Sequence, residues 1–225
     1  MLNLQSIHQA VTELQKEFRQ NPSLFFTEHD VAGRCYSLIQ SALQYPTVTG
    51  KDGSLFYLVH LGYPTPFRCD MTNENCDYKS ENDPTPQGNK YQREHFDLVV
   101  FNPTFLKECT YELIKGQNFE KLKQGLPFVL YQTQEPAILF GLEFMFNSAT
   151  FSSPKQAENW RDLVLQDYKK LQNSENWEYM PFMKEYRMLA FDGASDNEYS
   201  EFLKQGFKEY EGLEYLSKLE SGVME

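Results

Sequence analysis

Several features are scarce or missing in this sequence, and each absence limits what the protein can be. Cysteine occurs only 4 times in 225 residues, without the density and regular spacing of a disulfide framework, which favours free thiols in a reducing compartment. No run of about 18 consecutive apolar residues occurs, and polar residues interrupt the N-terminal stretch every second or third position, unlike a signal peptide. We therefore expect a cytoplasmic protein that makes no use of a membrane.

Positive charge is also in short supply. Lysine and arginine together number 21 against 32 aspartate and glutamate residues, a formal net charge of −11. A protein that coats nucleic acid without sequence preference needs a basic surface, so this class is excluded. Any contact with DNA or RNA must be local, and a protein is the alternative partner.

Familiar catalytic signatures are missing as well. The sequence has no Gly-x-Ser-x-Gly elbow, no glycine-rich phosphate loop and no His-Glu-x-x-His, so it gives no support for hydrolase triads, P-loop nucleotide use or zincin chemistry. Cys69 and Cys76 suggest zinc together with His60 or His95, but their spacing lies outside the usual two to four residues. A solvated polar loop is the simpler interpretation of this segment.

Apolar periodicity and capping chemistry predict the helices. A helix beginning at Thr27 is marked by Asp30 three residues later, the pattern of a capping box. The clearest helix follows Ser152 and Ser153, with Pro154 in its first turn. Helices are expected near residues 4–18, 27–42, 105–113, 154–171 and 199–207, with weaker pieces at 119–122 and 210–216.

Strands are expected where apolar, branched and aromatic residues concentrate. The segments are 55–63, 94–103, 125–132, 136–147 and 185–193. Residues 64–93 are rich in Pro, Asn, Asp and Thr without periodicity, which predicts a long polar loop. The order of elements is typical of a single α/β domain over residues 1–225, with a mixed central sheet flanked by helices.

Two carboxylates stand out because each lies in an apolar strand segment. Asp97 precedes Leu98-Val99-Val100-Phe101, and Glu143 stands between Leu142 and Phe144. A carboxylate in a buried strand costs several kcal/mol unless it is paired or holds a cation. Two such groups on neighbouring strands indicate a metal site.

This pattern resembles the PD-(D/E)XK nuclease superfamily, whose members have the restriction-endonuclease-like fold. In that family the two acids hold one or two Mg²⁺ ions, and a lysine two residues after the second acid positions or polarises the attacking water. A glutamate on an N-terminal helix often completes the metal shell. The resemblance implies that Asp97 and Glu143 are the Mg²⁺ ligands and that Glu28 is the accessory ligand.

The sequence departs from the family at one motif position. Met145 stands where the family has lysine, and methionine has no charge and no donor to offer water. Some family members place the lysine on a neighbouring element, and Lys170 is favoured here because its surroundings resemble the helix that follows the motif. The other candidates are Lys155, Lys169, Lys184 and Arg187.

The resemblance implies metal-dependent hydrolysis of phosphodiester bonds in DNA or RNA. The alternative is a degenerate member that has lost hydrolysis and keeps the scaffold for binding protein or nucleic acid. Simpler roles also stay open: Asp97 marking a strand start, Glu143 pairing with Arg187 or Lys184, and Glu28 as a favourable charge in a helix's first turn. His95 shares a strand face with Asp97 and is either a base, a metal neighbour or an ordinary surface group.

Overall fold

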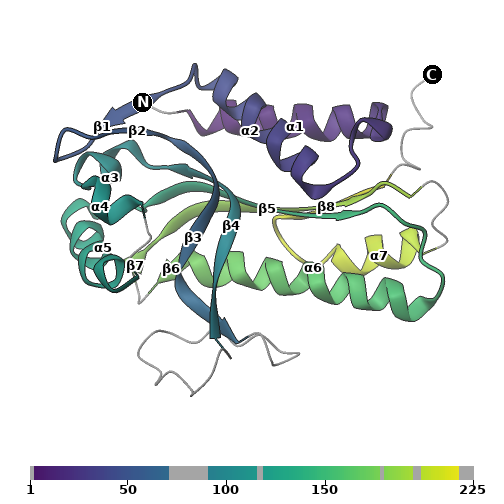
Figure 1. Ribbon diagram of the computed structural model, residues 1–225. Helices are drawn as coiled ribbons and strands as arrows, with labels where there is room; N and C mark the ends of the chain where they lie inside the picture. The colour runs from purple at the N-terminus through teal and green to yellow at the C-terminus, as the bar shows by residue number, and fades with distance from the viewer. Residues whose placement is uncertain (1–2, 71–90, 116–118, 178–179, 195–198, 218–225) are drawn as a thin grey trace. The chain divides into compact units, whose positions relative to one another are not determined.

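The computed structural model describes residues 3–70, 91–115, 119–177, 180–194 and 199–217 (Figure 1). The helices are α1 (Leu4–Gln20), α2 (Glu28–Ala42), α3 (Pro103–Lys107), α4 (Tyr111–Ile114), α5 (Phe119–Thr133), α6 (Pro154–Glu175) and α7 (Ser200–Phe207), with a 3-10 turn η1 (Pro22–Leu24). The strands are β1 (Thr47–Thr49), β2 (Leu55–Tyr57), β3 (Val59–Asp70), β4 (Tyr91–Phe101), β5 (Ile138–Asn147), β6 (Asn176–Trp177), β7 (Met180–Pro181), β8 (Met183–Asp192) and β9 (Leu213–Ser217).

The central feature is a five-stranded sheet in the order β3-β4-β5-β8-β9. Strands β3 and β4 pair antiparallel, whereas β8 and β9 pair parallel, so the sheet is mixed. Two-stranded ribbons, β1-β2 and β6-β7, lie outside it. The predicted α/β class with a mixed sheet and flanking helices is therefore confirmed.

The chain divides into two compact units, and both contribute to strands β5 and β8. The first unit comprises residues 1–44, 142–169 and 187–225, and the second comprises residues 45–141 and 170–186. No helix of the described residues is long and apolar enough to cross a bilayer.

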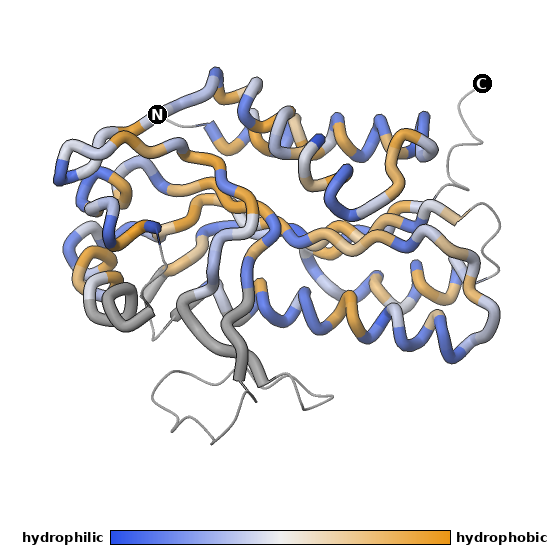
Figure 2. Tube along the Cα trace, viewed as in Figure 1, coloured by the Kyte–Doolittle hydropathy of each residue, from blue (hydrophilic) through white to orange (hydrophobic). Residues whose placement is uncertain are grey.

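In the first unit, helices cover both faces of the strands. Helices α1 and α2 lie on one side of β5 and β8, and α6 and α7 lie on the other (Figure 1). Along these strands apolar residues predominate (Figure 2). The apolar stripe of α1 ends in Phe18, whose ring contacts Phe191 at 4.9 Å and Phe146 at 6.5 Å between centroids. These contacts define the α1 side of the sheet.

Helix α2 begins as the capping chemistry predicts. Thr27 Oγ1 accepts a hydrogen bond from Asp30 N at 3.3 Å, and Asp30 Oδ2 accepts one from Thr27 N at 2.9 Å. Hydrogen bonds from the Phe26 amide and from Thr27 hold the pKa of Asp30 below its usual value. The predicted capping box is therefore confirmed.

In the second unit, the turn of the β1-β2 ribbon is fixed against the segment between α3 and α4. Gly50 N donates to Ser54 O at 2.8 Å, and Lys51 N donates to Cys109 O at 2.9 Å. The described cysteine thiols, Cys35 and Cys109, are free and buried. Burial raises the pKa of both thiols, that of Cys109 to about 12, which disfavours the reactive thiolate at neutral pH.

Two predicted elements are wrong. Residues 125–132, expected as a strand, belong to helix α5, in which Leu126, Val129 and Leu130 are buried while Phe128 and Tyr131 are exposed. This spacing of three and four residues is the period of a helix. Residues 210–216, expected as a short helix, end in strand β9, which pairs with β8.

The boundaries of the predicted long loop also differ. Strand β3 continues to Asp70 and strand β4 begins at Tyr91, so both ends of the 64–93 segment are extended strand. Residues 71–90 lie outside the described part of the chain. The zinc hypothesis on Cys69 and Cys76 depends on that segment, because Cys76 falls within it.

Candidate active site

Glu143 lies in the middle of β5 and is 1% exposed. Side chains alternate between the faces of a strand, so Glu143 shares its face with Met145 and Asn147. Phe146 lies on the opposite face, where its ring contacts Phe18 of α1. The carboxylate therefore points to the face of β5 that is turned away from α1.

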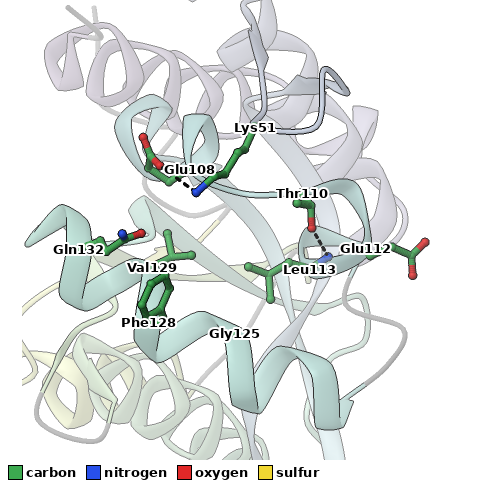
Figure 3. A pocket seen from close by; sticks show the side chains of 9 residues that line it. All are labelled: Lys51, Glu108, Thr110, Glu112, Leu113, Gly125, Phe128, Val129 and Gln132. Carbon is green, nitrogen blue, oxygen red and sulfur yellow. Dashed lines mark hydrogen bonds and ion pairs between the residues drawn. The ribbon is translucent and has the colours of Figure 1, made fainter.

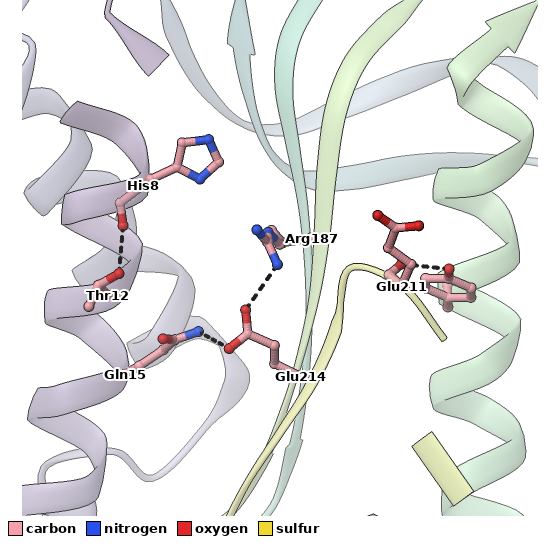
Figure 4. A network of polar contacts seen from close by, with 7 residues as sticks. His8, Thr12, Gln15, Arg187, Glu211 and Glu214 are labelled. Carbon is pink, nitrogen blue, oxygen red and sulfur yellow. Dashed lines mark hydrogen bonds and ion pairs between the residues drawn. The ribbon is translucent and has the colours of Figure 1, made fainter. Parts of the chain in front are cut away.

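Arg187, one proposed partner of Glu143, lies on the other face of the sheet. It shares the face of β8 with Phe191, which contacts Phe18 of α1. Arg187 Nη1 instead contacts Glu214 Oε1 at 3.3 Å, and Gln15 Nε2 donates to Glu214 Oε2 at 2.8 Å (Figure 4). The interpretation of Glu143 as the ion-pair partner of Arg187 is therefore wrong.

Lys170 is the candidate cation that the fold buries. It lies in α6, is 4% exposed, and its Nζ donates to the backbone carbonyl of His95 at 3.0 Å. Ser174, which is fully buried, donates through Oγ to Lys170 O at 2.6 Å. An ammonium taken out of water costs several kcal/mol unless it has hydrogen-bond and charge partners. The fold therefore holds this cation against strand β4.

The hydrogen bond from Lys170 reaches β4 close to the first candidate carboxylate. His95 precedes Asp97 by two residues, and Asp97 is half-buried. Lys170 and the strand that carries Asp97 are thus brought together within the second unit. Of the five basic residues considered as replacements for the motif lysine, Lys170 alone is buried; the others are Lys155, Lys169, Lys184 and Arg187.

Glu28 occupies the first turn of α2, directly after the Thr27 cap. A carboxylate in this position interacts favourably with the helix N-terminus. Among the described residues, no group of three or more His, Cys, Asp or Glu side chains is placed to hold a metal ion. Metal ligation by Glu28, Asp97 and Glu143 stays a prediction.

A buried carboxylate that the sequence did not single out lies at the end of β8. Asp192 is fully buried, and its Oδ1 accepts from Asn147 Nδ2 at 2.9 Å and from Ala194 N at 3.3 Å. Its Oδ2 accepts from the Tyr215 hydroxyl at 2.7 Å, and the same hydroxyl lies 3.3 Å from Ser200 Oγ. In the sequence, Asp192 is marked only by the glycine that follows it, because Asp-Gly is a dipeptide typical of turns. With each carboxylate oxygen hydrogen-bonded, Asp192 joins the ends of β5, β8 and β9.

Comparisons with protein-family models, with curated proteins and with solved structures give no match. The candidate residues are a carboxylate on β4, a carboxylate on β5 and a buried lysine on α6.

Proposed function

We propose that this protein is a PD-(D/E)XK nuclease-like phosphodiesterase that hydrolyses nucleic acid with the help of Mg²⁺. In this proposal Asp97 and Glu143 are the metal ligands, Glu28 is an accessory ligand, and Lys170 takes the role of the missing motif lysine. The observation that carries the proposal is the buried Lys170 ammonium on the carbonyl of His95, two residues from Asp97.

The donor set fits the ion. Mg²⁺ prefers oxygen ligands and commonly takes one or two carboxylates together with water and phosphate oxygens, and Asp97 and Glu143 provide two. When bound, the ion activates a water molecule and neutralises charge that develops on the phosphate.

Lys170 supplies what methionine lacks. A lysine ammonium has a positive charge and hydrogen-bond donors, and the hydrogen bond to the His95 carbonyl fixes its position. The fixed ammonium is suited to orient a water molecule or a phosphate oxygen. Assistance of this kind in proton transfer contributes about 10² to 10⁴ in rate.

Met145 favours the second candidate function, a nuclease-like scaffold that binds protein or nucleic acid without hydrolysis. Met145 shares the strand face of Glu143, the face on which the family's lysine lies. The net charge of −11 also weakens any general attraction for nucleic acid. Activity and binding must therefore be measured separately.

The decisive experiment combines calorimetry with cleavage. Mg²⁺ and Mn²⁺ binding is measured on the native chain and on an Asp97→Ala, Glu143→Ala double variant, and single-stranded and duplex DNA cleavage is assayed on the same samples. A Glu13→Ala, Glu158→Ala double variant is the matched control, because it removes two exposed carboxylates. We expect binding and cleavage to be lost in the first variant and kept in the control.

Two further variants separate the alternatives. Lys170→Met is expected to lower cleavage by about 10² to 10⁴ while metal binding is retained. If the native chain binds metal without cleaving, the degenerate alternative is supported, and Met145→Lys is then expected to produce cleavage. A native chain that binds neither Mg²⁺ nor Mn²⁺ would overturn the proposed function.

A further inference from the structure

The second unit contains a cavity of about 430 Å³ between the β1-β2 turn, the α3-α4 segment and α5 (Figure 3). This volume lies within the range of about 300–1,000 Å³ that small-molecule sites occupy. None of the residues assigned to the proposed nuclease site lines it. The residues that line it include Lys51, Glu108, Leu113, Phe128, Val129 and Gln132.

The walls of the cavity are held in place by backbone contacts. Lys51 N donates to Cys109 O, which fixes the turn that carries the Lys51 side chain. On the other side, Gly125 lets α4 approach α5, since a Cβ there would lie 2.8 Å from Leu113 Cδ1. The cavity is therefore a feature of the folded backbone as well as of the side chains around it.

The two sides of the cavity differ in chemistry. Leu113, Val129 and Phe128 form an apolar side, while Lys51 and Glu108 lie across from them (Figure 3). Phe128 is 60% exposed although it lines the cavity. An aromatic face left open to water beside a polar edge suits a flat ligand with apolar faces and a polar rim.

The charged side chains around the cavity further limit the class of ligand that it can bind. Lys51 Nζ lies 3.9 Å from Glu108 Oε2, and Lys115 Nζ lies 2.7 Å from Glu112 Oε1. Lys51 is thus the one basic side chain among the described residues that line the cavity, against Glu108 and Glu112, and Glu112 is paired with Lys115 outside the lining, so the cavity gives no net attraction for phosphate. The cavity is suited to an uncharged ring whose edge carries hydrogen-bond donors and acceptors, and a nucleobase has this chemistry.

We propose that this cavity binds an unpaired nucleobase, stacked on Phe128 with its edge toward Lys51, Glu108 and Gln132. Unpaired bases stack on exposed aromatic side chains and are read along their edges. Tyr131, three residues further along α5 and 69% exposed, offers a platform for a neighbouring base. The inference rests on the proposed function, because it makes single-stranded nucleic acid the substrate class.

The test measures binding in the absence of divalent metal. Adenosine and a short single-stranded deoxyadenylate are titrated into the native full chain, Phe128→Ala and Phe26→Ala. Phe26 is the matched control, since it is 74% exposed and belongs to the first unit. We expect Phe128→Ala to weaken both ligands about five-fold or more, the effect of removing one stacking platform. Phe26→Ala is expected to bind as the native chain does, and Phe128→Trp to keep binding.

Several results would overturn the inference: no adenosine binding by the native chain at millimolar concentration, equal losses in Phe128→Ala and Phe26→Ala, or adenosine binding that falls steeply with added salt. Tighter binding of the oligonucleotide than of adenosine supports a base that belongs to a single strand, whereas equal affinity would overturn single-stranded nucleic acid as the ligand class. The Asp97→Ala, Glu143→Ala variant is expected to keep adenosine binding. Failure of the cavity and failure of the nuclease site are therefore separable.

Discussion

Among the glycines that the structure describes, Gly50 is the one at which an added methyl group would lie closest to its neighbours. A Cβ on Gly50 would overlap the Phe56 ring and lie 2.6 Å from the carbonyl oxygen of Cys109. That oxygen cannot retreat freely, because it accepts the hydrogen bond from Lys51 N at 2.9 Å. Overpacking costs about 1–3 kcal/mol and a weakened backbone hydrogen bond about 1 kcal/mol. We expect Gly50→Ala to lower the free energy of unfolding by about 2–4 kcal/mol.

Gly33 provides the matched control, at which the same substitution is expected to raise the free energy of unfolding. It is exposed within α2, and a Cβ there would meet nothing within 4 Å. Alanine is favoured over glycine inside a helix by about 0.5–1 kcal/mol. Gly33→Ala is therefore expected to stabilise the protein by that amount.

Urea unfolding followed by far-UV circular dichroism measures both variants. With a slope of about 1–3 kcal/mol per molar urea, Gly50→Ala should lower the midpoint by roughly 0.7 M or more, and Gly33→Ala should raise it slightly. Because the turn carries Lys51, Gly50→Ala should also weaken adenosine binding. A Gly50→Ala midpoint equal to or above that of the native chain would refute the packing argument.

Two further predictions concern polar contacts. Tyr215→Phe removes a hydrogen bond to the buried Asp192 carboxylate. Because hydrogen bonds to charged groups are worth about 1.5–3 kcal/mol, we expect this variant to lower the free energy of unfolding by about that amount. A urea midpoint unchanged by the variant would show that the network does not stabilise the fold. Hydrogen bonds from the Phe26 amide and from Thr27 lower the pKa of Asp30. The Asp30 carboxylate therefore stabilises the fold above its unfolded-state pKa of about 3.9, and this stabilisation is lost as the pH falls through its folded-state pKa. Asp30→Ala should therefore be less stable than the native chain at pH 7 and similar to it near pH 2, and a constant difference between these pH values would contradict the assignment.

The sequence was a good guide where the deciding chemistry is local. The capping box of α2 needs only Thr27 and Asp30, three residues apart, and α6 begins at the predicted Pro154. Such signals act through hydrogen bonds within one turn, so no distant contact is needed to interpret them. The mixed sheet and its flanking helices followed from the order of these elements.

Short apolar runs were misjudged because burial, which depends on tertiary contacts, decides their structure. The run Gly125 to Gln132 contains branched and aromatic residues typical of a strand, yet it forms part of α5 despite Pro127 within it. At β9 the spacing of Leu213 and Leu216 fits a helix, but parallel pairing with β8 buries both residues in a strand. Periodicity alone does not separate helix from strand over so few residues.

The candidate site also combines a feature that local sequence predicts with features that depend on tertiary contacts. The apolar strand around Glu143 predicts its burial, and Glu143 is indeed 1% exposed. Which basic residue is buried could not be predicted, because it depends on how the end of α6 packs against β4. The Asp192 network escaped notice for a similar reason: its donors, Asn147 and Tyr215, lie 45 and 23 residues away in the chain.

The alternation of β5 determines where a catalytic cation could come from. On the face that carries Glu143, the next positions are Met145, which has no charge, and Asn147, which donates to Asp192. Arg187 points to the other face, where it contacts Glu214. Neither Met145 nor Arg187 therefore supplies a cation on that face of β5, and Lys170 is the buried one among the five basic residues considered. The proposed hydrolysis thus depends on Lys170, while Met145 marks the position at which the family's own arrangement could be restored.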